Sequence, residues 1–116
     1  MAGKVLLISD DVMFWAKVHG LAKAAGIPVA RIPDEAAMEA AFREGGVAKV
    51  LADLGSRSVD LLGWAQRWKS ATPPPRLIAY GSHVDTAAME RAAVAGFDEV
   101  MPNSQFHRSL GDLLGQ

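Results

Sequence analysis

The setting of Asp53 suits either a chemical site or the cap of a turn, because this carboxylate ends an apolar run and precedes small polar residues. The stretch reads VLADLGSRS over 50–58. Two more carboxylates, Asp10 and Asp11, directly follow the apolar run KVLLIS at 4–9. Clustered carboxylates supply the oxygen ligands that Mg²⁺ prefers. Each of them can equally accept backbone N–H bonds at a turn or at the start of a helix.

Polar residues also follow two later apolar runs. RLIAYG at 76–81 precedes Ser82 and His83, and FDEVM at 97–101 precedes the polar stretch 102–104. A histidine titrates near neutral pH when unperturbed, although a single loop histidine is most often simply solvated. If the runs are parallel strands, their carboxyl ends share one edge of a sheet, which would bring these polar residues near the carboxylates.

Alternating apolar and amphipathic segments run along the chain and predict the elements that would position these residues. Strands are predicted at 4–9, 28–32, 47–54, 76–81 and 97–101. Apolar residues at helical spacing follow each strand, and glycines such as Gly26, Gly45 and Gly96 supply the stops. Unbroken apolar runs are typical of strands buried on both faces. The predicted class is α/β, a doubly wound parallel sheet of five strands in a (βα)5 arrangement.

Composition narrows the classes of partner and site. With 116 residues, half of them apolar, the chain has the size of one compact domain. The net charge is −1 with acids and bases interspersed, so neither a nucleic acid nor a membrane surface is expected as a partner. The absence of cysteine excludes disulfides, thiolate zinc sites and cysteine nucleophiles. The first apolar run is too short for a signal peptide, so a cytoplasmic location is expected.

Taken together, these elements and residues resemble the receiver (CheY-like) domains of bacterial response regulators. Those domains have the flavodoxin-like strand order 2-1-3-4-5. The resemblance covers essentially the whole chain and rests on the strand pattern and on the positions of Gly26, Asp53 and Gly96. It implies a single receiver-like domain over 1–116, of the kind used in two-component signal transduction and phosphorelays.

The resemblance also implies a role for each residue at the predicted sheet edge. Asp53 falls on the phosphoacceptor position, and the main-chain carbonyl of Gly55 falls on the position of the third metal ligand. Asp10 matches the second residue of the family's acidic pair, whereas Ser9 replaces the first. A weak Mg²⁺ site formed by Asp10, Asp53 and Gly55 is therefore implied, and no other cofactor is expected.

Two other positions of the family's switch machinery depart from the pattern. The hydroxyl position after the fourth strand falls on Gly81, with Ser82 one residue late, and the lysine position after the fifth strand falls on Asn103. An asparagine has no charge, so a charge-assisted hydrogen bond to a phosphoryl group becomes a neutral one of about half the strength. These departures predict a degenerate receiver, or pseudo-receiver.

Tryptophans are the candidates for a protein-binding surface. Trp15 is predicted at the edge of its helix, whereas Trp64 and Trp68 lie one helical turn apart and can form one aromatic patch. Burial of this pair against the sheet is the favoured interpretation. Exposure of the pair would instead make both residues anchors for a partner.

The segment HVDTAAMERAAVAG predicts a helix that packs closely through alanine. Its predicted inward residues are Ala88, Met89, Ala92 and Ala93. Glu90 and Arg91 are predicted to lie outward. The family resemblance implies a homodimer through this helix and the last one.

Three hypotheses of function follow. The first is a stand-alone, non-enzymatic signalling module that binds a protein, a histidine kinase or a downstream signalling protein, with phosphorylation of Asp53 lost or impaired. The second is a working response regulator with Mg²⁺-dependent phosphorylation of Asp53. The third is a small flavodoxin-like ligand-binding protein or enzyme, which is disfavoured because no Gly-rich phosphate loop follows the first strand.

Overall fold

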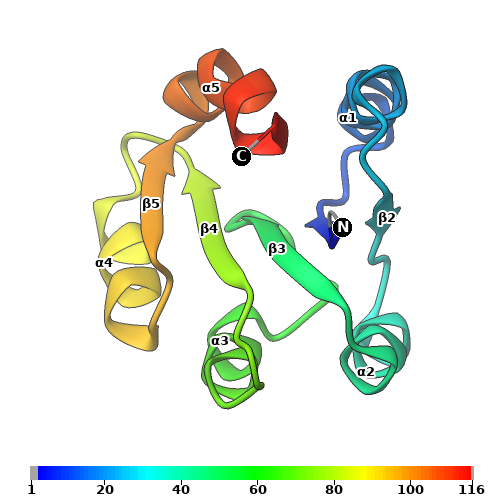
Figure 1. The fold of residues 1–116 in the computed structure, drawn as a ribbon. Helices are drawn as coiled ribbons and strands as arrows, with labels where there is room; N and C mark the ends of the chain where they lie inside the picture. Colours follow the sequence, from blue (N-terminus) through cyan, green and yellow to red (C-terminus); the bar gives the residue numbers. More distant parts are fainter. Residues whose placement is uncertain (1–2, 116) are drawn as a thin grey trace.

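The structure, a computed structural model, describes residues 3–115. Strands and helices alternate along the chain (Figure 1). The strands are β1 (Lys4–Ile8), β2 (Val29–Arg31), β3 (Val47–Asp53), β4 (Arg76–Gly81) and β5 (Glu99–Pro102). The helices are α1 (Val12–Ala25), α2 (Glu35–Glu44), α3 (Leu61–Lys69), α4 (Thr86–Ala95) and α5 (Asn103–Gly115).

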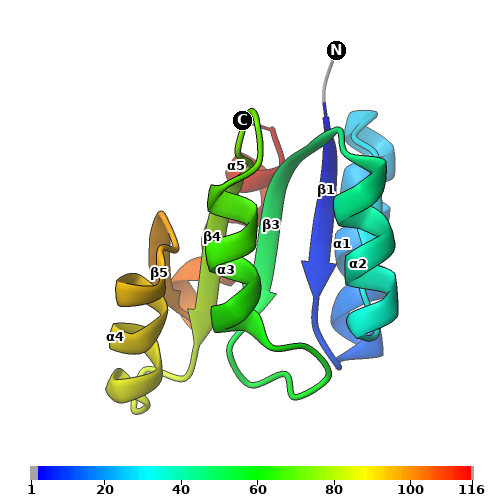
Figure 2. The same ribbon diagram turned by 90° about the horizontal axis from the view of Figure 1, so that it is seen from below.

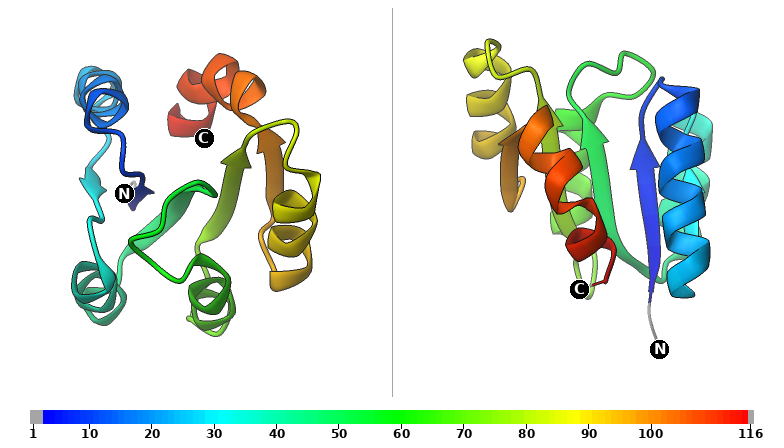
Figure 3. Two further views of the ribbon diagram at one scale, coloured as in Figure 1. Left: turned by 180° about the vertical axis from the view of Figure 1, so that it is seen from behind. Right: turned by 90° about the horizontal axis from the view of Figure 1, so that it is seen from above.

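All neighbouring strands pair in parallel, and their order in the sheet is β2-β1-β3-β4-β5. Helices α2, α3 and α4 cover one face of the sheet, as Figure 2 shows, and α1 and α5 cover the other (Figure 3, right). This confirms the predicted flavodoxin-like, doubly wound fold. None of the helices within residues 3–115 combines the length and the apolar composition needed to cross a lipid bilayer.

The sheet separates two apolar clusters because successive residues of a strand point to opposite faces. On β3, Val50 and Ala52 belong to the cluster under α2, α3 and α4, whereas Leu51 belongs to the cluster under α1 and α5. Asp53 therefore faces the α1 and α5 side, since it lies two residues beyond Leu51. This alternation decides which side chains the site can contain.

Trp64 and Trp68 are buried, so their candidacy as exposed anchors for a partner is wrong and the burial interpretation holds. Their exposed fractions are 7% and 3%. Both rings pack against Phe42 of α2, because α3 turns its aromatic face toward α2 and the sheet. Trp15 is partly buried and its ring lies 5.3 Å from that of His19, so it stays a candidate contact residue.

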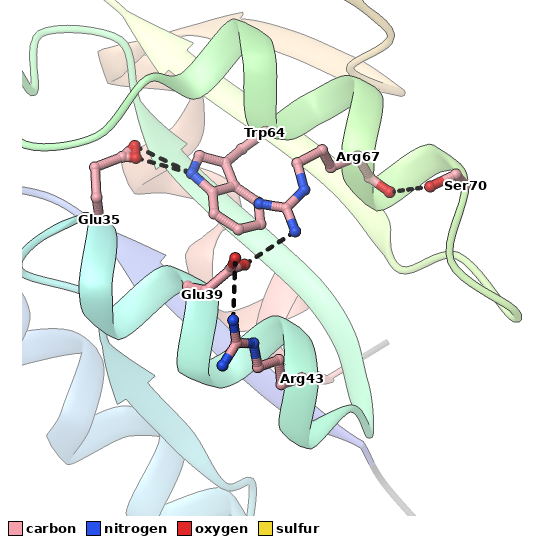
Figure 4. Close-up of polar contacts among 6 residues, drawn as sticks. All are labelled: Glu35, Glu39, Arg43, Trp64, Arg67 and Ser70. Atoms are coloured by element: carbon pink, nitrogen blue, oxygen red, sulfur yellow. Dashed lines mark hydrogen bonds and ion pairs between the residues drawn. The ribbon is translucent and has the colours of Figure 1, made fainter.

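Charged residues seal the outer edge of this aromatic group (Figure 4). The indole N–H of Trp64 donates to both carboxylate oxygens of Glu35, at 2.9 and 3.1 Å. The Arg67 guanidinium lies 4.1 Å from the centre of the Trp64 ring and forms a 2.9 Å ion pair with Glu39. The hydrogen bonds to Glu35, the ion pair with Glu39 and a second cation–π contact of Arg67, 4.7 Å from the centre of the Phe42 ring, join α3 to α2.

Candidate functional site

The carboxyl ends of β1, β3 and β4 form one edge of the sheet, where the β3–α3 loop lies beside the end of β1 (Figure 2). Asp53 is the last residue of β3, and Ser9 follows β1 directly. The predicted convergence of residues from different strands is therefore present. The hydrogen bonds of each residue decide what this edge can do chemically.

Asp53 is partly buried and has two local hydrogen-bond partners. Its Oδ1 accepts the backbone N–H of Gly55 at 2.8 Å, and its Oδ2 accepts the Ser9 hydroxyl at 3.4 Å. Burial raises the pKa of Asp53, and the charges of Asp10 and Asp11 add to the rise, while the bonds from Gly55 and Ser9 oppose it. The folded protein thus holds a proton on Asp53 more readily than an exposed aspartate would.

Replacing Asp53 by asparagine is expected to stabilise the fold at neutral pH, because burial disfavours the charged form of Asp53. The pKa of Asp53 is higher in the folded protein than in the unfolded chain, where it is about 3.9. The wild type therefore loses stability as the pH rises from the pKa of the unfolded chain through that of the folded protein. The asparagine variant has no such titration and keeps an acceptor for the Gly55 N–H. Urea denaturation at a series of pH values should show the variant to be more stable than the wild type at pH 7, and this difference in the free energy of unfolding should disappear in acid. A difference that does not change with pH would contradict a raised pKa for Asp53.

Asp10 turns toward the β3–α3 loop. Its Oδ1 accepts the hydroxyls of Ser58 at 2.6 Å and Ser56 at 3.1 Å, and its Oδ2 accepts the Arg57 N–H at 3.3 Å. The bond from Ser58 is the largest of several effects that lower the pKa of Asp10. Both oxygens of this carboxylate are therefore engaged in holding the loop.

Asp11 acts as the N-cap of α1, because its Oδ1 accepts the Phe14 N–H at 3.0 Å. A Mg²⁺ ion between Asp10 and Asp53 would have to compete with the hydrogen bonds that these carboxylates already accept. Among residues 3–115, no group of three or more carboxylate, histidine or cysteine side chains is placed to hold a metal. Asp10 and Asp53 supply two carboxylates, and Ser9 is neutral where a third would add charge, so the donor set fits a weak Mg²⁺ site better than a tight one.

Tyr80, rather than Gly81, presents its side chain on the same side as Asp53. The two are register partners on adjacent parallel strands, so they share a face of the sheet. A Cβ on Gly81 would instead lie 3.3 Å from the Cβ of Leu54, on the opposite face. Tyr80 is thus the β4 side chain that shares the face of Asp53, and the assignment of Gly81 to the family's hydroxyl position stays a prediction.

The Tyr80 hydroxyl is buried and forms no well-aligned hydrogen bond among the described residues, although the Ser9 hydroxyl is near enough to lower its pKa. Burial raises the pKa of Tyr80 far above its usual range, and the nearby charge of Asp53 adds to this. The Tyr80 ring stacks on Phe106 of α5 with centres 3.8 Å apart. Tyr80 thus connects the surroundings of Asp53 to α5, and sequence analysis missed it. A register count along the fourth strand could have found it.

The remaining predicted site residues lie at the rim. Ser82 is exposed, and its hydroxyl accepts the Val84 N–H at 3.4 Å within the loop after β4. His83 is exposed in the same loop, and Asn103 is exposed at the first position of α5. Gly55 is also exposed and contributes its N–H to Asp53. None of these rim residues adds a charge near Asp53.

Comparison with known proteins gives no sequence relative, since no protein-family model and no curated protein matches the chain. Solved structures do match. A response regulator receiver domain from Bermanella marisrubri superimposes with a TM-score of 0.78 at 17% identity, covering 98% of this chain and 99% of that one. The receiver domain of the sensor histidine kinase PA1611 from Pseudomonas aeruginosa PAO1, with magnesium in its active-site cleft, gives 0.74 at 15% identity and covers 100% of both chains.

A third match is an atypical orphan response regulator, described as having a phosphorylation-independent regulatory mechanism. It gives a TM-score of 0.73 at 14% identity and covers 96% of this chain and 88% of that one. Identities this low establish the fold and leave activity open. In strand order, helix placement and coverage, the chain has the fold of response regulator receiver domains.

Proposed function

We propose that the chain is a receiver-like signalling module over 1–116 that acts by binding a partner protein, and that phosphorylation of Asp53 is lost or impaired. The observation that carries the proposal is the engagement of Asp10, whose two carboxylate oxygens accept three hydrogen bonds from the β3–α3 loop. The expected partner is a histidine kinase or a downstream signalling protein in the cytoplasm. No catalytic role is assigned to the chain.

The chemistry of phosphorylation explains why this engagement matters. Transfer of a phosphoryl group to a carboxylate requires positive charge to offset the charge of the phosphoryl oxygens, which bound Mg²⁺ supplies in such sites. In this chain Ser9 is neutral and Asn103 is neutral, and Asp10 is engaged elsewhere. Without a bound metal, Asp53 would face an incoming phosphoryl group with little compensating charge beyond that of Arg31, whose Nε donates to the Ser9 carbonyl at 3.3 Å. An atypical orphan response regulator of the same fold is described as having a phosphorylation-independent regulatory mechanism, which supports the proposal.

Titration with Mg²⁺ and beryllofluoride tests the proposal. In the wild type, amide NMR signals of Asp10, Asp53 and Gly55 are expected to show no saturable shift at millimolar Mg²⁺, alone or with beryllofluoride. The reason is that both ligands need charged side chains and carboxylate oxygens free of hydrogen bonds, whereas Ser9 and Asn103 are neutral and the oxygens of Asp10 accept hydrogen bonds. Saturable shifts that extend into α4 and β5 would instead establish a working phosphoacceptor.

A restored variant provides the matched control. Ser9→Asp with Asn103→Lys supplies the missing carboxylate and the missing cation, and Ser58→Ala removes the shortest hydrogen bond to Asp10, so the triple variant is expected to gain saturable shifts at the same amides. Adding Asp53→Asn to this variant should remove the beryllofluoride response, because an amide lacks the negatively charged carboxylate oxygen to which beryllofluoride binds. The control also shows that the NMR assay would detect binding if the wild type had it.

A further inference from the structure

A pocket of about 310 Å³ lies at the end of the sheet opposite to Asp53. It is formed around the α2–β3 loop (45–46) and the α3–β4 loop (70–75), and Figure 2 shows both loops at the end where β3 and β4 begin. The residues that line it are Phe42, Gly45, Gly46, Val47, Trp68, Ala71, Thr72, Pro73 and Pro75. A mostly apolar concave space of this size is typical of sites that bind small molecules.

Two features of the backbone hold the pocket open. Gly45 and Gly46 have φ of +73° and +72°, and a Cβ on either would meet no atom beyond its chain neighbours within 4 Å. This wall is therefore bare backbone, in a conformation that disfavours any larger residue. In the α3–β4 loop, proline fixes φ at Pro73 and Pro75. The shape of the pocket is thus set before a ligand binds.

The side chains of the pocket favour a neutral aromatic ligand. The rings of Phe42 and Trp68 meet edge to face with their centres 4.8 Å apart. Phe42 and Val47 are only half-buried, so part of their apolar surface is left uncovered. Aromatic rings attract a further ring in stacked or edge-to-face contact. None of the described residues that line the pocket is charged, so a charged ligand would lose its hydration without gaining a counter-charge.

Trp68 adds a hydrogen-bond donor that has no partner. The residue is 3% exposed, and its indole N–H is buried and meets no acceptor among the described residues. A buried donor without an acceptor is costly, and most such groups in folded proteins are paired. The position of Trp68 therefore calls for an acceptor that the described part of the chain does not supply.

The core cannot supply this acceptor. Trp68 also borders a void of about 10 Å³, whose other lining residues are all apolar or aromatic. A void of this size is at the lower limit for holding a water molecule. Among the described residues, Trp68 alone lines both the void and the pocket, so its side chain forms the wall between them. An acceptor for the indole must therefore enter from the pocket.

We propose that this pocket binds a small neutral aromatic molecule whose acceptor, a carbonyl oxygen or a ring nitrogen, takes the indole N–H of Trp68. The indole nitrogen is covered in the free protein, so the ring turns slightly in its site as the ligand enters, a change that is common on binding. The proposal goes beyond the proposed function, because the pocket shares no residue with the site around Asp53.

Acetophenone and toluene serve as probes, since both carry a phenyl ring and only acetophenone has a carbonyl acceptor. In an amide NMR titration of the wild type, acetophenone should give saturable shifts at Gly45, Gly46 and Ala71 and at the indole N–H of Trp68. A millimolar Kd is expected for a ligand with so few atoms. Toluene should shift the same amides, because the apolar walls accept its ring.

Trp68→Phe is the matched variant, because it keeps a ring in the wall of the pocket and removes the donor. It should weaken the binding of acetophenone by about fivefold to tenfold relative to its effect on toluene, since only acetophenone loses a hydrogen bond. The amides of Gly45, Gly46 and Ala71 report both Kd values in this variant.

Two leucine variants test the location of the ligand. Ala71→Leu fills the pocket and should abolish the binding of both probes. Ala87→Leu makes the same change in a separate groove between α3 and α4 and should leave both Kd values unchanged. Amide spectra that are unchanged away from each substitution will show that the variants are folded.

Three results would each overturn the proposal. The first is an absence of saturable shifts at the pocket amides when acetophenone approaches its solubility limit. The second is a Trp68→Phe variant that loses no more affinity for acetophenone than for toluene. The third is an Ala71→Leu variant that binds acetophenone as well as the wild type does.

Discussion

Replacing Phe106 by alanine is expected to lower the free energy of unfolding by about 3–5 kcal/mol. The Phe106 side chain is fully buried, and its ring is stacked on Tyr80 at 3.8 Å and lies 5.9 Å from Phe14. Its removal leaves a cavity between α1, α5 and the sheet that these aromatic rings cannot fill without leaving their own positions. Urea or guanidinium denaturation, with the slope compared between variant and wild type, measures the loss.

Tyr80→Phe is the matched control for the aromatic stack. It keeps the ring against Phe106 and removes only the buried hydroxyl that has no hydrogen-bond partner among the described residues. Its stability should therefore equal or exceed that of the wild type, because an unsatisfied buried polar group costs about 1–3 kcal/mol. A loss in Phe106→Ala below about 1 kcal/mol, or a clear loss in Tyr80→Phe, would show that the stack is not the main support of α5.

The order and type of all ten elements followed from apolar patterning, since buried parallel strands are unbroken apolar runs and glycines mark the helix ends. Boundaries were less predictable where a helix ends. The fifth strand was predicted at 97–101, but β5 begins at Glu99. Gly96 adopts a left-handed conformation and the Phe97 N–H bonds to the Ala92 carbonyl, so Phe97 completes the end of α4.

The candidate site could be located from the sequence but not described. Asp53 lies near the residues after β1 because β1 and β3 are parallel neighbours and end at the same edge of the sheet, which the predicted fold already implies. The orientation of Asp10 depends on the conformation of the β3–α3 loop, where Ser56 and Ser58 bind it, and no periodic pattern encodes that. Gly81 was assigned from the family resemblance, whereas the place of Tyr80 on the face of Asp53 depends on the register of β4 against β3, because successive residues of a strand point to opposite faces.

Burial of Trp64 and Trp68 could be predicted from their helical spacing, but not their different polar surroundings. The Trp64 indole N–H donates to Glu35, whereas that of Trp68 is buried and has no partner among the described residues. Both rings contact Phe42. A pattern of apolar residues treats the two tryptophans as equivalent, whereas the hydrogen bonds distinguish them.

Trp68→Ala is accordingly expected to lower the free energy of unfolding by about 3–5 kcal/mol, because it empties a site that is 3% exposed between α2, α3 and the sheet. Trp68→Phe should recover most of this loss, since the phenyl ring keeps contact with Phe42 and the lost indole N–H had no acceptor among the described residues.

Trp64→Phe should behave differently from Trp68→Phe. It removes a hydrogen bond to a charged carboxylate and reduces the ring surface under Arg67, so a cost of about 1–2 kcal/mol is expected. The same Trp64→Phe substitution should cost less in a Glu35→Gln protein than in the wild type, because the indole then donates to a neutral amide instead of a charged carboxylate. Chemical denaturation of Trp64→Phe, Trp68→Phe, Glu35→Gln and the double variant Glu35→Gln/Trp64→Phe measures these differences. Equal losses in Trp64→Phe and Trp68→Phe would mean that ring volume alone, and not the hydrogen bond to Glu35, sets the stability of the contact between α2 and α3.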